Sequence, residues 1–227
     1  MNYDMKIAGN GKIPAGEYND INISGSATIL GAVRCKSFSA SGTTKGSALE
    51  CSGPFKTSGS TTFDGNVRAG SIKSSGSFSV HGDVAAASSF TSSGNITVHG
   101  DMEAEKIKID GSLACAGLIN AEVVDIKFGT GKDIGSIGGN KITVRVGNDR
   151  KFADRIPGVA NIVNSVSGNM CVKSYIEGND ILLEHVDAPR VTGRVVTIGK
   201  GCRIDLVQYS QEAIVSPKAT VGRVEKV

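Results

Sequence analysis

The sequence lacks tryptophan and has few other aromatic residues, which make up 5% of its 227 positions. Its hydrophobic share of 39% is below that of an ordinary globular domain. Such a chain can fill a long, thin core with small and medium side chains, but not a wide, round one. Four Tyr and no Trp also argue against a carbohydrate-binding face built from rows of exposed aromatic rings.

Long apolar runs are absent as well. Residues 1–14 contain no apolar signal segment, and no stretch approaches the length of a membrane span. The sequence therefore predicts a cytoplasmic protein, with membrane association through a short segment as an alternative.

The five cysteines form no CxxC spacing and are odd in number, so neither a disulfide framework nor a zinc site is indicated. We expect Cys35, Cys51 and Cys115 to pack as small hydrophobic residues. The 25 basic and 22 acidic residues are nearly balanced. A nucleic-acid-binding protein usually has clustered basic residues with aromatic stacking partners, so no nucleic-acid partner is predicted.

Glycine, with 30 residues, is nearly twice as frequent as usual, and much of it recurs in one dipeptide. The dipeptide returns at an almost constant interval, at Ser24-Gly25, Ser41-Gly42, Ser58-Gly59, Ser75-Gly76, Ser93-Gly94 and Asp110-Gly111. A fixed period of this kind indicates a repeat architecture in which each repeat packs on its neighbours.

Hydrophobic or small residues two positions apart flank these glycines, and alternation at period 2 indicates β-strands. Before the glycine stand Ile21/Ile23, Phe38/Ala40, Phe55/Thr57, Ile72/Ser74, Phe90/Ser92, Ile107/Ile109 and Val124/Ile126. After it stand pairs such as Phe78/Val80, Ile96/Val98 and Leu113/Cys115, and then a third set that includes Val33/Cys35, Val67/Ala69, Val84/Ala86, Met102/Ala104 and Ile119/Ala121.

Three short strands per repeat describe an all-β parallel β-helix, a triangular solenoid with about 17 residues per turn. Glycine suits its corners because it adopts positive φ without steric cost. Successive turns should pair as parallel strands about 4.8 Å apart. The unit 41–57 departs from the pattern, which we interpret as a local slip compensated within that turn.

The pattern divides the chain into four segments. Residues 1–18 form an N-terminal tail, 19–146 the β-helix, 147–169 an insertion that is a loop or a short helix, and 170–227 further β-helix turns. The last segment is predicted from two sets of residues at turn-length spacing: Ile181, Ile198 and Val215, and separately Val186, Ile204 and Val221.

Two His-Gly-Asp triplets are the most enzyme-like feature. His81 and Asp83 recur as His99 and Asp101 at the spacing of one repeat, so the pairs should stack on adjacent turns beside a corner. Stacked imidazoles and carboxylates are possible metal ligands, whereas the alternative is an outward-facing corner sequence in solvent. The Gly-rich runs at 129–132 and 135–139 lack the spacing of a phosphate-binding loop. We therefore predict no cofactor and no catalytic residue.

Three motifs resemble the bactofilins, the bacterial polymer-forming cytoskeletal proteins, and in particular their two-part members in Firmicutes. The chain begins its repeats with Gly16-Glu17-Tyr18-Asn19-Asp20-Ile21, has an Ile-Gly-Gly-x-Lys-Ile motif at 137–142, and ends with a segment like Ile198-Gly199 to Tyr209. The repeated corners, as in Val80-His81-Gly82-Asp83-Val84, are also similar.

This resemblance implies a right-handed β-helix and a non-enzymatic structural protein. It further implies self-assembly into nonpolar filaments without nucleotide, as a scaffold in cell shape, envelope organisation or motility. The partners would be other copies of the chain, a related bactofilin, and membrane or envelope proteins.

The physics of the fold favours polymerisation independently, because the ends of a parallel β-helix present unpaired strand edges. We expect the contacts at Ile21, Ile23, Val221 and Val224, and expect Ile23→Asp to block filaments in a folded monomer. The alternatives are a β-helix acyltransferase, whose hexapeptide rhythm this chain does not keep, and a carbohydrate-binding β-helix.

Overall fold

The computed structural model describes residues 3–130, 132–147 and 168–227. In these ranges the chain is all-β and winds as a parallel β-solenoid of about 12 turns, with about 17 residues per turn. The predicted fold class and turn length are confirmed. The chain divides into two compact units, which are described separately: unit 1 (Met1–Ile107 and Cys115–Gly117) and unit 2 (Lys108–Ala114 and Leu118–Val227).

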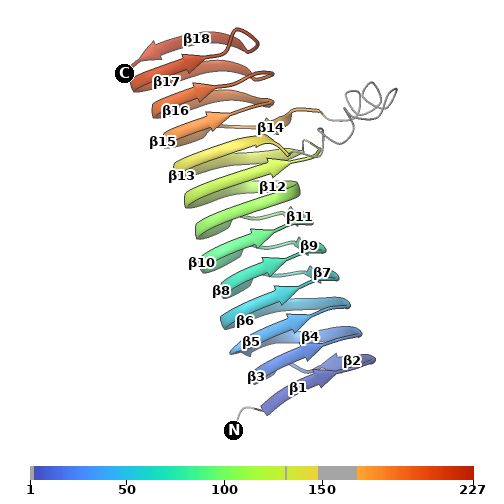
Figure 1. Ribbon diagram of the computed structural model, residues 1–227. Coiled ribbons are helices and arrows are strands. Elements are labelled where there is room, and N and C mark those ends of the chain that lie inside the picture. Colours follow the sequence, from blue (N-terminus) through green and yellow to red (C-terminus); the bar gives the residue numbers. More distant parts are fainter. Residues whose placement is uncertain (1–2, 131, 148–167) are drawn as a thin grey trace, which may run out of the picture. The chain divides into compact units, whose positions relative to one another are not determined.

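Unit 1 is built of short strands that follow one another around successive turns (Figure 1). They are β1 (Tyr3–Ile7), β2 (Asn10–Ile13), β3 (Gly16–Ile23), β4 (Ser26–Cys35), β5 (Ser37–Ala40), β6 (Thr43–Thr57), β7 (Ser60–Phe63), β8 (Val67–Ser74), β9 (Ser77–Val80), β10 (Val84–Ser92), β11 (Asn95–Val98) and the first part of β12 (Met102–Phe128). Each pairs in parallel with the segment one turn away. One column of partners runs through Ile21, Phe38, Phe55, Ile72 and Phe90, as the period of the sequence predicts.

Each turn of unit 1 has three inward-facing pairs. In the turn that contains β4, for example, the pairs Ile21/Ile23, Ala27/Ile29 and Val33/Cys35 are all buried, and the residues between them are exposed or half-buried. The predicted inward positions Thr57, Ser74 and Ser92 are buried too, although they are polar. The three-sided coil is therefore confirmed.

Phenylalanine side chains stack along the core of unit 1. The rings of Phe38 and Phe55 lie parallel with centroids 4.9 Å apart, and Phe55 and Phe78 follow at 5.5 Å. Phe63 and Phe90 extend the cluster with centroid distances of 6.2 Å to Phe55 and Phe78 respectively. Offset and edge-on aromatic pairs stabilise a core beyond the area that they bury. The few aromatic residues of the chain are thus concentrated where consecutive turns need large side chains.

Register shifts absorb the irregular spacings. The offset between paired residues of β4 and β6 is shorter at Ala32↔Ala48 than at Ile29↔Gly46, and a second shift follows after Cys51. This pair of shifts is the predicted slip and its compensation. The single longer step, between Ile72 and Phe90, has a similar origin, because the register of β10 shifts between Ala86 and Ser89.

The prediction that the corner glycines adopt positive φ is wrong, because close packing of the backbone requires them instead. None of Gly25, Gly42, Gly59, Gly76 and Gly94 has φ in the left-handed region. Instead they stack on one another, and a Cβ on any of the last four would lie 1.9–2.0 Å from the carbonyl oxygen of the glycine one turn earlier. Only glycine allows this approach.

The assignment of residues 1–18 to a tail is wrong for the part that the structure describes. β1 pairs with β3 in the registers Met5↔Ile21 and Ile7↔Ile23, and β2 pairs with β4. These segments lack the Ser-Gly corner, but they alternate inward and outward side chains like the later turns. They form the first turn of unit 1.

Unit 2 continues the same construction. It contains the remainder of β12, followed by β13 (Asp133–Val146), β14 (Met170–Val172), β15 (Ile176–Leu183), β16 (Val186–Ile198), β17 (Arg203–Val215) and β18 (Thr220–Lys226). The segment 139–144 pairs with 178–183, so that Gly139 meets Gly178 and Ile142 meets Ile181. The predicted further β-helix turns after residue 170 are present.

Part of the predicted C-terminal register is wrong. Ile181 pairs with Val196 rather than Ile198, and Ile204 pairs with Ala188 rather than Val186. The turn is shortened because β15 and β16 are joined by only Glu184 and His185, and His185 adopts φ 55°. A non-glycine residue in this conformation is uncommon, and it makes a tight corner. The pairings Ile198↔Val215 and Ile204↔Val221 are as predicted.

The predicted insertion at 147–169 falls almost entirely outside the described residues. In the ranges that the structure describes, no helix has both the length and the apolar character needed to cross a membrane.

Candidate functional site

The two predicted His-Gly-Asp triplets form two side-chain ladders at one corner of unit 1. In the first ladder, the rings of His81 and His99 have centroids 4.7 Å apart. The Nδ1 atom of His81 lies 3.2 Å from Oδ1 of Asp64, which is the equivalent residue one turn earlier. These side chains are exposed on the outside of the coil.

The second ladder consists of Asn66, Asp83 and Asp101. The backbone N–H of Asp83 donates to Oδ1 of Asn66 over 2.9 Å, and that of Asp101 donates to Oδ1 of Asp83 over 3.0 Å. A Cβ on the preceding Gly82 or Gly100 would lie 2.1–2.2 Å from the same oxygens. Each Asx oxygen therefore satisfies a backbone donor at a corner where strand pairing is interrupted.

This geometry favours a structural role for His81, Asp83, His99 and Asp101. The two ladders bring the residues onto neighbouring turns, as predicted. However, no group of three or more His, Cys, Asp or Glu side chains that could hold a metal ion exists within the described part of the chain. Chemically, the two ladders connect consecutive corners through hydrogen bonds.

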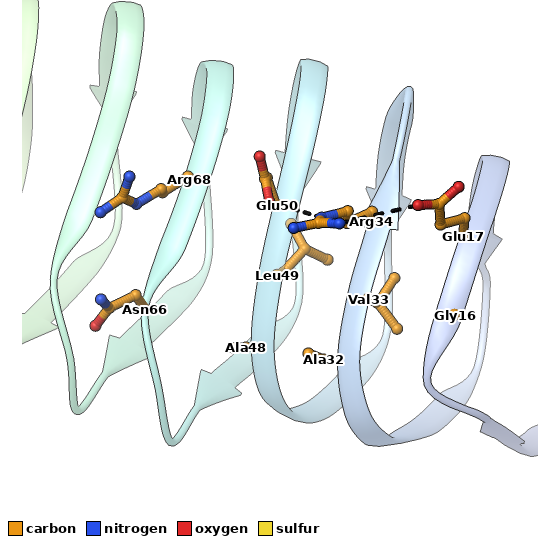
Figure 2. A pocket seen from close by; sticks show the side chains of 10 residues that line it. All are labelled: Gly16, Glu17, Ala32, Val33, Arg34, Ala48, Leu49, Glu50, Asn66 and Arg68. Atoms are coloured by element: carbon orange, nitrogen blue, oxygen red, sulfur yellow. Dashed lines mark hydrogen bonds and ion pairs between the residues drawn. The ribbon is translucent and has the colours of Figure 1, made fainter.

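A third ladder, of alternating charge, lines a shallow groove of about 460 Å³ on unit 1 (Figure 2). Glu17, Arg34, Glu50 and Arg68 occupy equivalent positions on successive turns. The Nε atom of Arg34 lies 3.0 Å from Oε2 of Glu50, and its NH1 atom lies 3.9 Å from Oε1 of Glu17. The floor between the charges is made of small residues, including Ala48.

The charge ladder stabilises neighbouring turns only weakly. The side chains of Arg34 and Glu50 are 69% and 60% exposed, and exposed ion pairs of this kind contribute about 0–1 kcal/mol. Sequence reasoning missed this ladder. The signal was present as charges of alternating sign at turn-length spacing, but the slip between β4 and β6 changes that spacing and obscures it.

The predicted contact residues at the N-terminal side do not lie on the outer turn of unit 1. Ile21 and Ile23 are 0% and 3% exposed, because β1 pairs over them. The outer turn of unit 1 is instead formed by β1 and β2. In β1, Tyr3 is 58% exposed, while Met5 and Ile7 are half-buried although they point inward.

At β18 the inward side chains of unit 2 are accessible to solvent. Two inward columns of unit 2 reach Ile204 and Val207, both of which are buried, and end one turn later at Val221 and Val224. Val224 is 47% exposed and Val221 is half-buried. The predicted contact residues on this side therefore do lie on an accessible end turn.

The exposed end extends to β17. Ala213 and Val215 continue the inward columns of Val196 and Ile198, but β18 pairs only with the earlier part of β17, from Arg203 to Tyr209. Val215 is consequently 38% exposed. We call the four inward residues of this last turn the end face: Ala213, Val215, Val221 and Val224.

In the described residues β18 pairs with β17 alone, so the end face combines apolar side chains with an unpaired strand edge. Such an edge can accept another strand through backbone hydrogen bonds. The chain matches no family model, no curated protein and no solved structure in the comparisons made with it.

Proposed function

We propose that the chain is a non-enzymatic scaffold that assembles with copies of itself through the ends of its solenoid. The observation that carries this proposal is the end face, where inward columns of unit 2 terminate in exposed valines. Elsewhere the next turn closes the core, whereas no turn of the described chain covers it here.

Assembly would remove two unfavourable features at once, the unpaired strand edge and the exposed apolar side chains. An added turn would pair with the free edge of β18 and would bury the end face. Full burial of a valine side chain contributes about 1.5–3 kcal/mol, so the half-exposed Val215 and Val224 supply part of that each. The outer turn of unit 1, with its exposed Tyr3 and half-buried Met5, offers a second surface of the same kind.

The resemblance to bactofilins supports the same proposal and extends it. By that likeness the polymer forms without nucleotide, serves cell shape, envelope organisation or motility, and includes a related subunit or recruits membrane or envelope proteins. The solenoid of unit 1 suits a scaffold, because it repeats the same backbone geometry at each turn.

Negative-stain electron microscopy of the purified chain without nucleotide tests the proposal. We expect filaments that form as the concentration rises, together with a sedimentation coefficient that increases with concentration. A monodisperse monomer at high concentration would contradict the proposal and would favour the β-helix enzyme as the alternative. Binding of acetyl-CoA by that monomer would then identify the acyltransferase class.

A further inference from the structure

Two cysteines of unit 1 occupy equivalent positions on adjacent turns. Cys35, at the end of β4, is in direct register with Cys51 in β6. Both side chains point into the core and are buried, with 6% and 2% exposure. The next turns have alanine in this column, at Ala69 and Ala86. Among these turns, two cysteines are therefore adjacent in the column only at Cys35 and Cys51.

The spacing of the pair suits a disulfide. Neighbouring parallel strands lie about 4.8 Å apart, which is within the range of Cα separations that a disulfide bridges. The register shift directly after Cys51 interrupts the ladder next to it, at the corner 52–53. The backbone beside the pair is therefore irregular.

The two thiols differ in acidity because they interact with each other. A hydrogen bond from Cys35 lowers the pKa of Cys51 to about 7, and the same bond raises the pKa of Cys35. Burial acts against this lowering of the Cys51 pKa, and hydrogen bonds with the backbone at Gly53 and Phe38 add to it. In its protonated form the Cys51 thiol donates to the backbone carbonyl oxygens of Lys36 and Pro54. Cys115 provides a contrast, because burial without a thiol partner raises its pKa to about 12. A thiolate is the reactive form of cysteine.

A route from solvent reaches Cys35, and Cys51 lies directly beside it in register without lining the pocket itself. A pocket of about 240 Å³ on unit 1 is lined by Cys35 together with Tyr18, Arg34, Lys36 and Ser52, and by two glutamates. Its size admits a small molecule. The two cations and the hydroxyl groups at its walls suit a small polar reagent.

We propose that Cys35 and Cys51 form a redox-active thiol pair that hydrogen peroxide converts into a disulfide between adjacent turns. In the first step the Cys51 sulfur attacks a peroxide oxygen, an S–O bond forms, the O–O bond breaks, and the leaving oxygen takes a proton to become water. In the second step the Cys35 sulfur attacks Cys51, the S–S bond forms, and the hydroxyl leaves with the Cys35 proton as water. Two thiols lose two electrons in all, and the peroxide is reduced to two waters.

The test uses the full chain, reduced and then treated with hydrogen peroxide near neutral pH, followed by tryptic peptide mapping without reduction. Cleavage after Arg34, Lys36 and Lys45 separates the two cysteines. We expect a disulfide-linked peptide pair that dithiothreitol releases, formed at least about tenfold faster than any oxidation of Cys115. The oxidised chain should also melt at a higher temperature, because the link constrains the unfolded chain.

Single variants separate the roles. Cys35→Ala introduces the residue that this column has in later turns, so the fold should be kept. A sulfenic-acid trap such as dimedone should then label Cys51, whereas it should not label Cys51 in the native chain. Cys115→Ala is the matched control and should form the disulfide normally.

Two results would overturn the proposal. One is that both thiols remain free at a peroxide concentration that oxidises Cys115. The other is that Cys35 and Cys51 are oxidised separately, without a bond between them, in a chain that circular dichroism shows to be folded.

Discussion

Val224 and Val207 are direct partners in the parallel ladder of β17 and β18, yet Val207 is fully buried and Val224 is 47% exposed. The two residues have the same inward orientation, so the difference arises because no turn of the described chain covers Val224. The position is therefore a sensitive place to test assembly without disturbing the core of the monomer.

Val224→Asp should abolish filaments while the chain remains folded. The aspartate is solvated in the monomer but would have to lose its water at a junction between copies, which is costly for an unpaired charge. Electron microscopy and sedimentation at matched concentrations measure the effect. Leu182→Asp is the control, because Leu182 is 39% exposed but lies on β15 between two paired strands.

The assignment of the contact to β18 would be refuted if the Val224→Asp chain formed filaments like the native chain. If Leu182→Asp also abolished filaments, charge rather than position would be responsible.

Ile23→Asp is expected to unfold unit 1, in contrast to the expectation drawn from the sequence. Ile23 is 3% exposed and lies under Ile7 of β1, so an aspartate there would be buried without a partner. A loss of several kcal/mol in the free energy of unfolding follows. Thermal melts followed by circular dichroism check this, with the exposed neighbour in Asn22→Asp as the control. A folded Ile23→Asp monomer that fails to assemble would restore the original interpretation.

The regular part of the fold was predictable because one signal repeats in every turn. Phe55 alternates with outward residues, which requires a strand. An inward hydrophobic residue recurs at Ile72, which requires a neighbouring strand in the next turn. The first turn was missed because Met5 and Ile7 precede their partners at a slightly shorter spacing than the later turns keep, and no Ser-Gly corner marks them.

Corner geometry was the part that spacing could not predict. The shortened turn at Glu184 and His185 depends on one residue adopting positive φ, which a period does not reveal. The His-Gly-Asp triplets were located from the sequence. However, the role of Asp83 depends on its 3.0 Å distance to the backbone of Asp101, and only the structure provides that.

Asp83→Ala should destabilise unit 1 by about 0.5–1.5 kcal/mol, because the backbone N–H of Asp101 loses its acceptor. Asp83→Asn should cost much less, since the equivalent residue one turn earlier is Asn66, whose oxygen makes the same hydrogen bond. Chemical denaturation of both variants measures the difference. A metal-binding role predicts the opposite pattern: zinc would raise the melting temperature of the native chain, and Asp83→Asn would remove that effect.

Gly59→Ala should destabilise unit 1 by about 1–3 kcal/mol, the usual cost of forcing extra volume into a packed site. Its Cβ would lie 1.9 Å from the carbonyl oxygen of Gly42, and that atom belongs to the backbone of the neighbouring turn. Gly9→Ala is the matched control, since Gly9 begins the same column and a Cβ there meets nothing within 4 Å. Equal melting temperatures for the two variants would show that the corner glycines are not required for close stacking.

Gly9→Ala also tests the proposed assembly. It leaves the monomer unchanged, but it should weaken filaments if another copy packs against the outer turn of unit 1.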